Sequence, residues 1–350
     1  MDLTFNAGGI LARGRGLTFD DVLIVPSKSA VRSRKDPTLS SRITKRHKLT
    51  LPFISANMDT ITESAMAIAM DKLGGLGILH RFMTVEQQMK EVTAVKASGA
   101  KLIAASIGVN DEGRSRAEAL VKAGANILTI DIAHGHSTAM IETLQWLRDK
   151  FGDSVDLIAG NVATPEATLE LIEAGADAIK VGIGPGSMCT TRVITGCGVP
   201  QLTAVAWAVD VARAHNVPVI ADGGLKASGD IVKAFAAGAE TVMLGSLLSG
   251  TLETPGEIHH GRKQYRGMAS RSAQVSWRGG LPEGMAPEGE STSVAVKGSV
   301  KDVVNELAGG LRSGMSYINA IEMNEICEKA RFIEMSGAGA YESRAHGLKP

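Results

Sequence analysis

Short apolar runs alternate with stretches of helical periodicity along most of this chain. The apolar runs that we interpret as strands are residues 52–56, 76–79, 102–106, 127–131, 157–160, 178–181, 217–222 and 241–245. The helical patterns between them cover residues 63–72, 84–98, 113–123, 137–150, 165–174, 203–215 and 229–237. Near-continuous apolar strands are typical of a parallel sheet buried on both faces, and eight of them favour closure. The sequence therefore predicts an α/β fold, a (β/α)8 TIM barrel. A doubly wound open sheet is the alternative, but it would need a G-x-G-x-x-G turn after an early strand.

Two long segments interrupt this alternation. Residues 182–200 form a Gly-rich loop after the sixth strand, and residues 257–298, rich in Gly, Pro, Ser and charge, follow the eighth. Loops of this length inside a compact domain are usually functional or disordered, and we interpret 257–298 as a mobile flap over the barrel mouth. Helical patterns resume within 299–335. We thus predict one catalytic barrel domain over residues 1–350, with the C-terminal helices packed outside it.

The composition supports the predicted fold, and the charge balance excludes some classes of binding partner. Hydrophobic residues make up 44% of the 350 and aromatic residues only 4%, whereas glycine reaches 40, which suits an α/β fold with many tight turns. The 37 basic and 37 acidic residues balance, so no basic field is available for nucleic acid or an anionic membrane. The three cysteines are too few for a disulfide framework, and no apolar run is long enough to span a bilayer. We expect a cytoplasmic protein.

Polar residues follow several of the predicted strands directly. Asn57, Asp131, Asn161 and Asp222 each stand where a strand ends. In a closed barrel these ends meet at one face, where barrel enzymes carry their active sites. The pattern predicts a site at that face.

The loop 182–192 (GIGPGSMCTTR) carries the strongest candidate chemistry. Its glycines let the backbone approach a ligand, and its carbonyls suit a monovalent cation. Cys189 follows the most irregular part of the loop, so we interpret it as a nucleophile, with Thr191 placed to polarise water or a leaving group. Cys197 and Cys327 fit the usual role of a small core residue.

The loops after strands seven and eight predict a phosphate site. Barrel enzymes often bind phosphate there through backbone N–H groups. We expect Gly224, Gly245 and Ser246 to hold the phosphate, with Asp222, next to Gly223, accepting from ribose hydroxyls. In the flap, Tyr265 adds a candidate phosphate contact, and Gly267 and Met268 offer backbone to a base.

These motifs together closely resemble the IMP dehydrogenase and GMP reductase family. The likeness covers nearly the whole chain, in the segments 16–23 (GLTFDDVL), 55–59 (SANMD), 131–136 (DIAHGH), 159–162 (AGNV), 182–192, 221–224 (ADGG), 310–313 (GLRS) and 336–339 (SGAG). The family implies a barrel that assembles as a homotetramer. Many dehydrogenase members carry a pair of CBS modules between strand two and its helix, but here residues 80–83 run directly into a helix.

The resemblance also implies roles for individual residues. Cys189 attacks C2 of a purine 5′-monophosphate, GMP or IMP, and a hydride passes between C2 and NAD(H) or NADP(H). The nucleotide is bound by Ser187, Asp222, Gly223, Gly224, Gly245, Ser246 and Tyr265, and Glu288 reads N1 of the base. Asp131, Ala133 and Asn161 line the nicotinamide side. The carbonyls of Gly184, Gly186 and Cys189 hold potassium.

The direction of the reaction follows less directly from these motifs. In the family, the dehydrogenase activates water with an Arg-Tyr pair, but here Arg278 has no Tyr after it. The reductase expels ammonia with the help of a Thr and a Glu, but here Arg271 stands at the expected Glu position. The short flap favours GMP reductase (GMP and NADPH to IMP, ammonia and NADP) as our main hypothesis. IMP dehydrogenase (IMP, NAD and water to XMP and NADH) is the alternative. Arg271 contacts the dinucleotide phosphates or caps the flap.

Two other classes of function stay open from the sequence. A non-catalytic nucleotide-binding relative would not need the thiol of Cys189. A non-redox phosphate-binding barrel, such as an aldolase, would need a basic residue at a strand end, and Lys180 in strand six is the candidate.

Overall fold

A closed barrel of eight parallel strands forms the centre of the molecule. The computed structural model describes residues 3–281 and 283–343. The barrel strands are joined in chain order, with the last beside the first: β5 (Phe53–Ser55), β6 (Leu76–Leu79), β7 (Ala104–Ile107), β8 (Ile127–Asp131), β9 (Asp156–Val162), β10 (Ala178–Val181), β11 (Val219–Asp222) and β12 (Thr241–Leu244). The predicted (β/α)8 barrel is confirmed.

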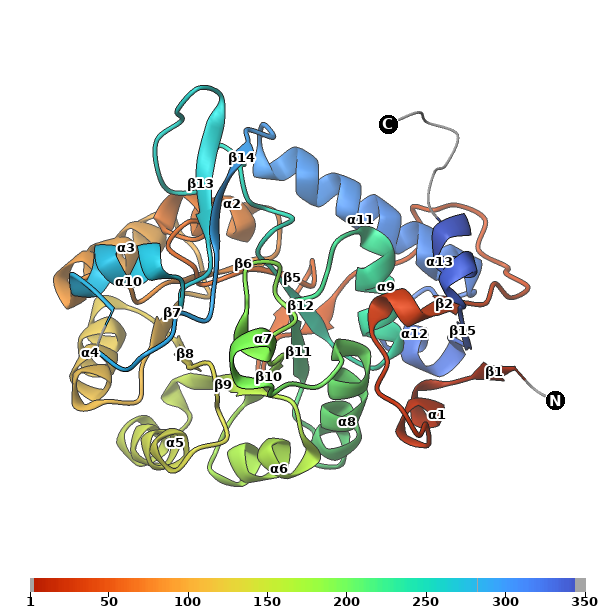
Figure 1. The fold of residues 1–350 in the computed structure, drawn as a ribbon, viewed down its shortest axis with the longest axis horizontal. Helices are drawn as coiled ribbons and strands as arrows, with labels where there is room; N and C mark the ends of the chain where they lie inside the picture. The colour runs from red at the N-terminus through yellow and green to blue at the C-terminus, as the bar shows by residue number, and fades with distance from the viewer. Residues whose placement is uncertain (1–2, 282, 344–350) are drawn as a thin grey trace.

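Helices surround the barrel in a ring (Figure 1). They are α2 (Ser64–Lys72), α3 (Val85–Ala97), α4 (Asp111–Ala123), α5 (Thr138–Phe151), α6 (Pro165–Glu173), α8 (Gln201–Ala214), α9 (Ser228–Ala236) and α11 (Val300–Tyr317), with short η2 (Gly152–Ser154) after α5. Several start where the sequence carries a capping residue: Thr84 accepts from the Gln87 N–H, and Asn110 accepts from the Gly113 N–H. Such caps explain why the predicted helix starts lie close to the observed ones.

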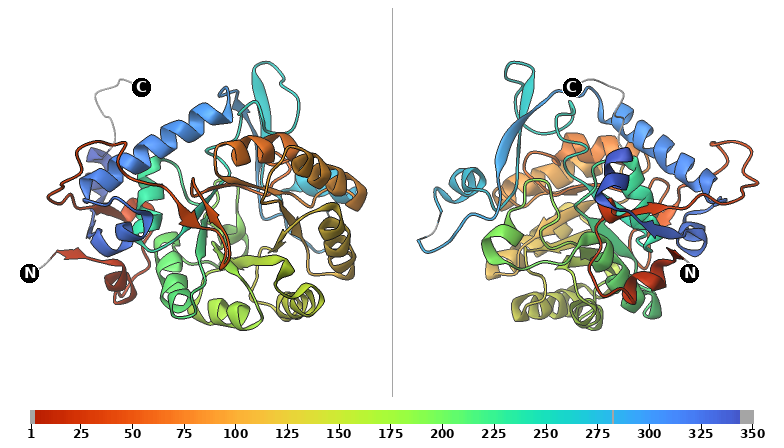
Figure 2. Two further views of the ribbon diagram at one scale, coloured as in Figure 1. Left: turned by 180° about the vertical axis from the view of Figure 1, so that it is seen from behind. Right: turned by 45° about the vertical axis from the view of Figure 1, so that its right-hand side comes forward.

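Both ends of the chain meet in a small sheet beside the barrel, visible in both views of Figure 2. The three antiparallel strands are β1 (Thr4–Phe5), β15 (Phe332–Glu334) and β2 (Val22–Ile24), and the nearby helices are α1 (Ala7–Leu11), η1 (Phe19–Asp21), α12 (Met323–Lys329) and α13 (Gly337–Glu342). The sequence analysis missed this sheet, because two- and three-residue strands leave no period to detect.

The segment 257–298 contains regular structure that its composition did not predict. It forms an antiparallel hairpin of β13 (Arg262–Arg266) and β14 (Ser291–Ala295), with α10 (Arg271–Arg278) inserted between the two strands. The hairpin stands away from the barrel in Figure 1. Its strands carry mostly polar side chains, so neither shows the apolar alternation of a half-buried strand.

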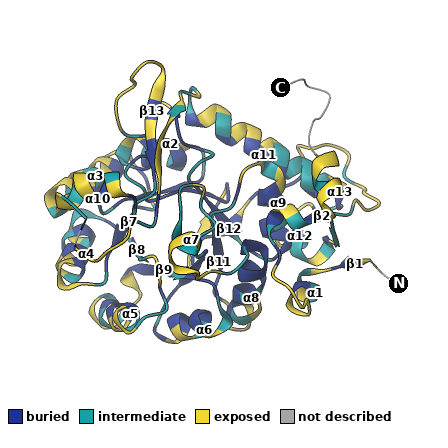
Figure 3. Ribbon diagram, viewed as in Figure 1, coloured by how far each residue is buried: buried dark blue, intermediate teal, exposed yellow. Residues whose placement is uncertain are grey.

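Two apolar clusters hold the barrel together, and Figure 3 shows buried residues in the barrel strands and in parts of the surrounding helices. The smaller cluster fills the barrel with side chains such as Ile54, Ile78, Ile127, Ile158 and Ile220. The larger cluster lies between the strands and the helices. Strands buried on both faces therefore explain the continuous apolar runs in the sequence.

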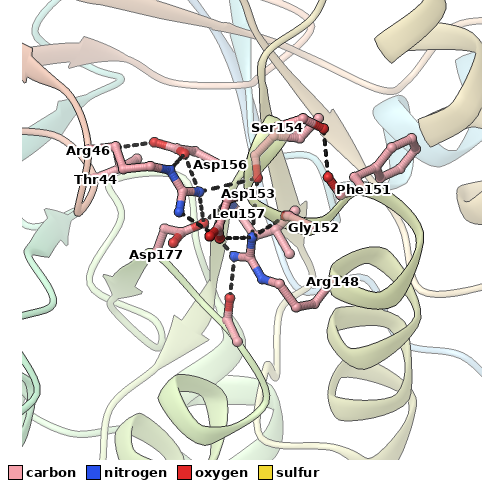
Figure 4. A network of polar contacts seen from close by, with 12 residues as sticks. Thr44, Arg46, Arg148, Phe151, Gly152, Asp153, Ser154, Asp156, Leu157 and Asp177 are labelled. Atoms are coloured by element: carbon pink, nitrogen blue, oxygen red, sulfur yellow. Dashed lines mark hydrogen bonds and ion pairs between the residues drawn. The ribbon is translucent and has the colours of Figure 1, made fainter.

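A network of ion pairs closes the amino end of the barrel (Figure 4). Arg46, in the turn between β3 (Ser41–Arg42) and β4 (Lys48–Leu49), donates to Asp156 at 2.6 Å and to Asp177 at 2.9 Å. Arg148 reaches Asp177 at 2.5 Å. The side chains of Asp156 and Asp177 are only 2% and 3% exposed, so their charges require these partners.

We expect Asp156→Asn to lower the free energy of unfolding by about 1.5–3 kcal/mol at neutral pH, as for a lost hydrogen bond to a charged group. Burial alone would raise the pKa of Asp156, but hydrogen bonds from Thr44, His47 and Arg46 hold it below the ordinary value. The carboxylate therefore stabilises the fold at neutral pH, and its contribution disappears as the pH falls through that lowered pKa. Denaturant unfolding of wild type and variant, repeated at decreasing pH, measures both effects.

Asp153→Asn is the matched control. Asp153 also pairs with Arg46, at 3.0 Å, but its side chain is 83% exposed. We expect this variant to change stability by less than about 0.5 kcal/mol. Equal losses in the two variants would contradict the importance of burial in this network.

Candidate active site

A cavity of about 530 Å³ opens at the carboxyl ends of the barrel strands. Its lining contains every site residue predicted from the sequence except Arg271: Asp131, Ala133, Asn161, Gly184, Gly186, Ser187, Cys189, Thr191, Asp222, Gly223, Gly224, Gly245, Ser246, Tyr265, Gly267, Met268, Arg278 and Glu288. A larger and more open cavity, of about 890 Å³, lies beside α3 and α4 and contains none of them. The smaller cavity is therefore the candidate site.

The Cys189 loop is shaped by close backbone packing. A Cβ on Gly182 would lie 2.1 Å from the carbonyl oxygen of Asp222, so this position accepts only glycine. The Cys189 N–H then closes a turn onto the carbonyl of Gly186 at 3.0 Å, and short helix α7 (Thr191–Thr195) follows. The turn presents the thiol to the cavity.

A line of hydrogen bonds leads away from the thiol. Cys189 Sγ donates to Thr191 Oγ1 at 3.1 Å, and Thr191 Oγ1 donates to Glu288 Oε2 at 2.8 Å. The Thr190 N–H also donates to the carbonyl of Glu288, at 3.0 Å, which fixes the flap segment against the loop. The sequence analysis assigned Glu288 only to the base. Its contact with Thr191 depends on the path of the flap, which the spacing of residues did not reveal.

Ser187 and Tyr265 meet beside the loops predicted to bind phosphate. Their hydroxyl oxygens lie 3.0 Å apart, and Tyr265 is buried. Burial raises the pKa of the Tyr265 hydroxyl, so it stays a neutral hydrogen-bond group. Gly223 and Gly224 have φ values of +93° and +79°, which favour glycine and turn the backbone at this edge. The arrangement is consistent with a site for an anion.

A cluster of charged and polar side chains lines the cavity next to Asp222, and it includes Lys180, which the sequence suggested only for a different class of reaction. Lys180 contacts Asp131 and Asp222, and Asn57 donates to Asp131 at 2.9 Å. Burial alone would raise the pKa of Asp131, but Lys180, Arg81 and Asn57 together hold it below the ordinary value. Asp131 is thus a charged acceptor at this side. The polar residues predicted at strand ends already included Asn57, but the sequence did not reveal that Asn57 donates to Asp131.

Arg81 is also a lining residue that sequence reasoning missed. Its guanidinium lies over the ring of Phe82 at 5.0 Å, and its buried Nε has no hydrogen-bond partner among the described residues. Burial and the nearby charges of Arg116 and Arg278 lower its pKa. A buried donor of this kind is expected to meet an acceptor on a bound ligand.

Several contacts attach the flap to the barrel, among them one buried ion pair and one ring contact. Arg266 of β13 pairs with Asp59, and the two side chains are 11% and 13% exposed. Arg266 also donates to the Ser276 hydroxyl at 3.0 Å, and Trp277 packs edge-on against Phe82 at 5.5 Å. These contacts bring Arg278 to the cavity.

Arg271 lies outside the cavity lining. It is the exposed first residue of α10, directly after the capping residue Ser270. The contact with dinucleotide phosphates predicted for it stays a prediction.

The fold and cavity define a (β/α)8 barrel with a thiol at its mouth. A family model described as the IMP dehydrogenase / GMP reductase domain matches residues 16–346. Inosine-5′-monophosphate dehydrogenase of Cryptosporidium parvum is 41% identical over 389 residues, covering 96% of each chain. The enzymes of that name from Bacillus subtilis and Helicobacter pylori are each 37% identical, covering 95% of this chain and 96% and 97% of their own. This chain belongs to the IMP dehydrogenase / GMP reductase family, and it is an NAD(P)-dependent oxidoreductase.

Two further features of the described residues concern metal-binding groups and membrane-spanning helices. In residues 3–281 and 283–343, no group of three or more His, Cys, Asp or Glu side chains is arranged to hold a metal ion. Within the same part of the chain, the helices lack the length and apolar character needed to cross a membrane.

We expect Arg266→Met to loosen the flap, because it leaves Asp59 buried without its cation. Trypsin cleavage after Arg271 and Arg278 should then become at least several-fold faster than in wild type. Timed digestion followed by mass spectrometry measures the rate at each site. Arg262→Met is the control, since exposed Arg262 lies in the same strand and pairs only with Ser293 of the hairpin. Unchanged cleavage in Arg266→Met would show that the ion pair does not hold α10.

Proposed function

We propose that this chain is an IMP dehydrogenase, which converts IMP, NAD and water to XMP and NADH. The relatives compared above have that name and match nearly the whole chain. This direction was the alternative in the sequence analysis, and the comparisons support it better than the reductase.

The names of these relatives carry the direction of the reaction, and the contact from Cys189 through Thr191 to Glu288 supports the chemistry at C2. Hydrolysis of an adduct on Cys189 needs a group that takes a proton from the attacking water. Arg278 has no following tyrosine, so the flap pair expected for this task is incomplete. Thr191 lies 3.1 Å from the thiol and 2.8 Å from the Glu288 carboxylate. A water molecule beside Thr191 would pass its proton to Glu288 by this route.

The residues then account for a balanced reaction. The Cys189 sulfur bonds to C2 of IMP while its proton leaves through Thr191 toward Glu288. A nicotinamide bound at this site would supply the acceptor for the hydride of C2. Glu288 releases the thiol proton to solvent, water then adds to C2 and gives a proton to Glu288, and the carbon–sulfur bond breaks with its electron pair returning to sulfur. Glu288 returns its proton through Thr191 to the thiolate, which restores the free thiol. Arg278, at the same cavity, supplies positive charge beside the developing oxyanion.

The opposite side of the cavity suits the dinucleotide. Asp131, Ala133 and Asn161 line it, and the unpartnered Nε of Arg81 offers a donor to a polar or anionic ligand. We propose NAD as the dinucleotide that these residues orient.

Three further predictions belong to this proposal. The carbonyls of Gly184, Gly186 and Cys189 would bind potassium, and that of Gly186 already accepts the N–H of Cys189. The protein would act as a homotetramer in the cytoplasm. Residues 1–350 would form a single catalytic domain, with β6 joined to α3 by residues 80–84 and 257–298 serving as its flap.

GMP reductase is the second candidate, favoured by the same Thr191–Glu288 contact. A protonated Glu288 could give its proton through Thr191 to the departing amine, so the pair supports expulsion of ammonia as well as attack by water. The reductase direction also fits the sequence of the flap, because Arg278 is not followed by the tyrosine expected in a dehydrogenase.

The two directions are separated by the near-ultraviolet absorbance of reduced nicotinamide. Purified protein receives IMP with NAD and potassium in one sample, and GMP with NADPH in another. If the absorbance rises in the IMP sample alone, the result supports the dehydrogenase. If the absorbance falls in the GMP sample alone, the result overturns the dehydrogenase in favour of the reductase. No change in either sample, with IMP still bound, favours the non-catalytic relative.

We expect Thr191→Val to reduce turnover by roughly 100-fold or more, as for loss of a general acid or base. Glu288→Gln should cause a loss of similar size, and the double variant should lose little more, because both act in one proton path. Initial rates with saturating IMP and NAD measure these effects. Thr195→Val is the control, since Thr195 lies in the same short helix but its hydroxyl donates to the carbonyl of Thr191 and accepts from the Cys197 N–H, with no bond to Glu288. Independent, multiplying losses would contradict a shared path.

A further inference from the structure

Lys180 is a buried charge between two strands that the chemistry above does not use. It lies in β10 with its side chain 2% exposed. Its ammonium contacts Asp131 at 2.6 Å and Asp222 at 2.7 Å, and it also donates to the side-chain oxygen of Asn161. One cation thus joins residues at the ends of β8, β9 and β11.

The backbone around Lys180 makes room for this arrangement. A Cβ on Gly160 would lie 2.5 Å from the carbonyl oxygen of Lys180 and 2.7 Å from its Cβ. Glycine at that position lets β9 and β10 approach closely. The Asn161 amide completes the cluster by donating to Asp222 at 2.9 Å and to the carbonyl of Gly182 at 2.8 Å.

The two carboxylates face different parts of the proposed reaction. Asp222 precedes the Gly223–Gly224 turn and is the proposed ribose acceptor, whereas Asp131 belongs to the proposed dinucleotide side. The hydrogen bonds and ion pairs of the described residues connect these carboxylates through Lys180 and Asn161, with no direct contact between them. A displacement of either carboxylate by a ligand therefore acts on the same ammonium.

Lys180 does not have the character of a reactive amine. Burial alone would lower its pKa, but the two carboxylates raise that pKa above its ordinary value. The amine stays protonated and has no lone pair for attack. This argues against the aldolase-like role considered from the sequence.

We propose that Lys180 is a positioning residue that couples the nucleotide site to the dinucleotide site through Asp222 and Asp131. The inference rests on the proposed function, since it assigns one ligand to each carboxylate. In this arrangement, the ligand that orders one carboxylate also fixes the ammonium for the other. Binding of either ligand then strengthens binding of the second.

The test measures affinity without turnover, using IMP and NADH, which cannot exchange a hydride with each other. NADH is titrated by its fluorescence with and without saturating IMP, and IMP is titrated calorimetrically with and without NADH. In wild type we expect each ligand to tighten the other by about 5-fold or more. In Lys180→Met we expect that factor to fall to about 1 and both affinities to weaken, and in Lys180→Arg we expect most of the coupling to return.

Lys263→Met is the matched control, since Lys263 is also buried but donates only to backbone and hydroxyl oxygens of residues 251–254. It should retain the coupling even if it loses stability. Lys180→Gln replaces Lys180→Met if the latter does not fold. If Lys180→Met or Lys180→Gln kept the full factor by which IMP and NADH tighten each other, the inference would be overturned. The absence of that factor in wild type would overturn it too. Either result would leave the proposed function intact. A wild-type protein that binds neither ligand would overturn both.

Discussion

Closure of eight short parallel strands into one barrel is the constraint on which the site depends. Closure brings all the carboxyl ends of the strands to one face, so residues from β8, β9, β10 and β11 become neighbours. The same geometry places the charged side chains of Asp131 and Asp222 at the cavity and buries that of Lys180 between them. Lys180 satisfies Asp131 and Asp222 there, because isolated charges would be too costly to bury. The barrel and its ionic cluster therefore depend on each other.

The flap supplies what the barrel cannot. Its attachment through Arg266 and Asp59 sets the path of the hairpin, and that path brings Glu288 to Thr191. The thiol lies on the barrel side and the carboxylate on the flap side, so the proposed proton route exists only when both segments are in place.

The choice between two reactions shows how far motif spacing can mislead. Arg271 at an expected Glu position and the missing tyrosine after Arg278 made both reactions look incomplete. The structure places Arg271 outside the cavity and provides a Thr–Glu pair from residues nearly a hundred positions apart. That pair serves either water attack or amine departure, so the relatives, rather than the motif count, favour the dehydrogenase.

The sequence by itself determined the barrel and the order of its elements, because apolar period, capping residues and strand-end polar residues are local signals, and the residues it assigned to the site line the cavity, apart from Arg271. It did not determine the small terminal sheet or the flap hairpin, whose strands are too short or too polar to show a period. Nor did it reveal that Lys180 contacts both Asp131 and Asp222 or that Thr191 donates to Glu288. Those contacts join residues distant in sequence, and only chain closure and the path of the flap bring them within bonding distance.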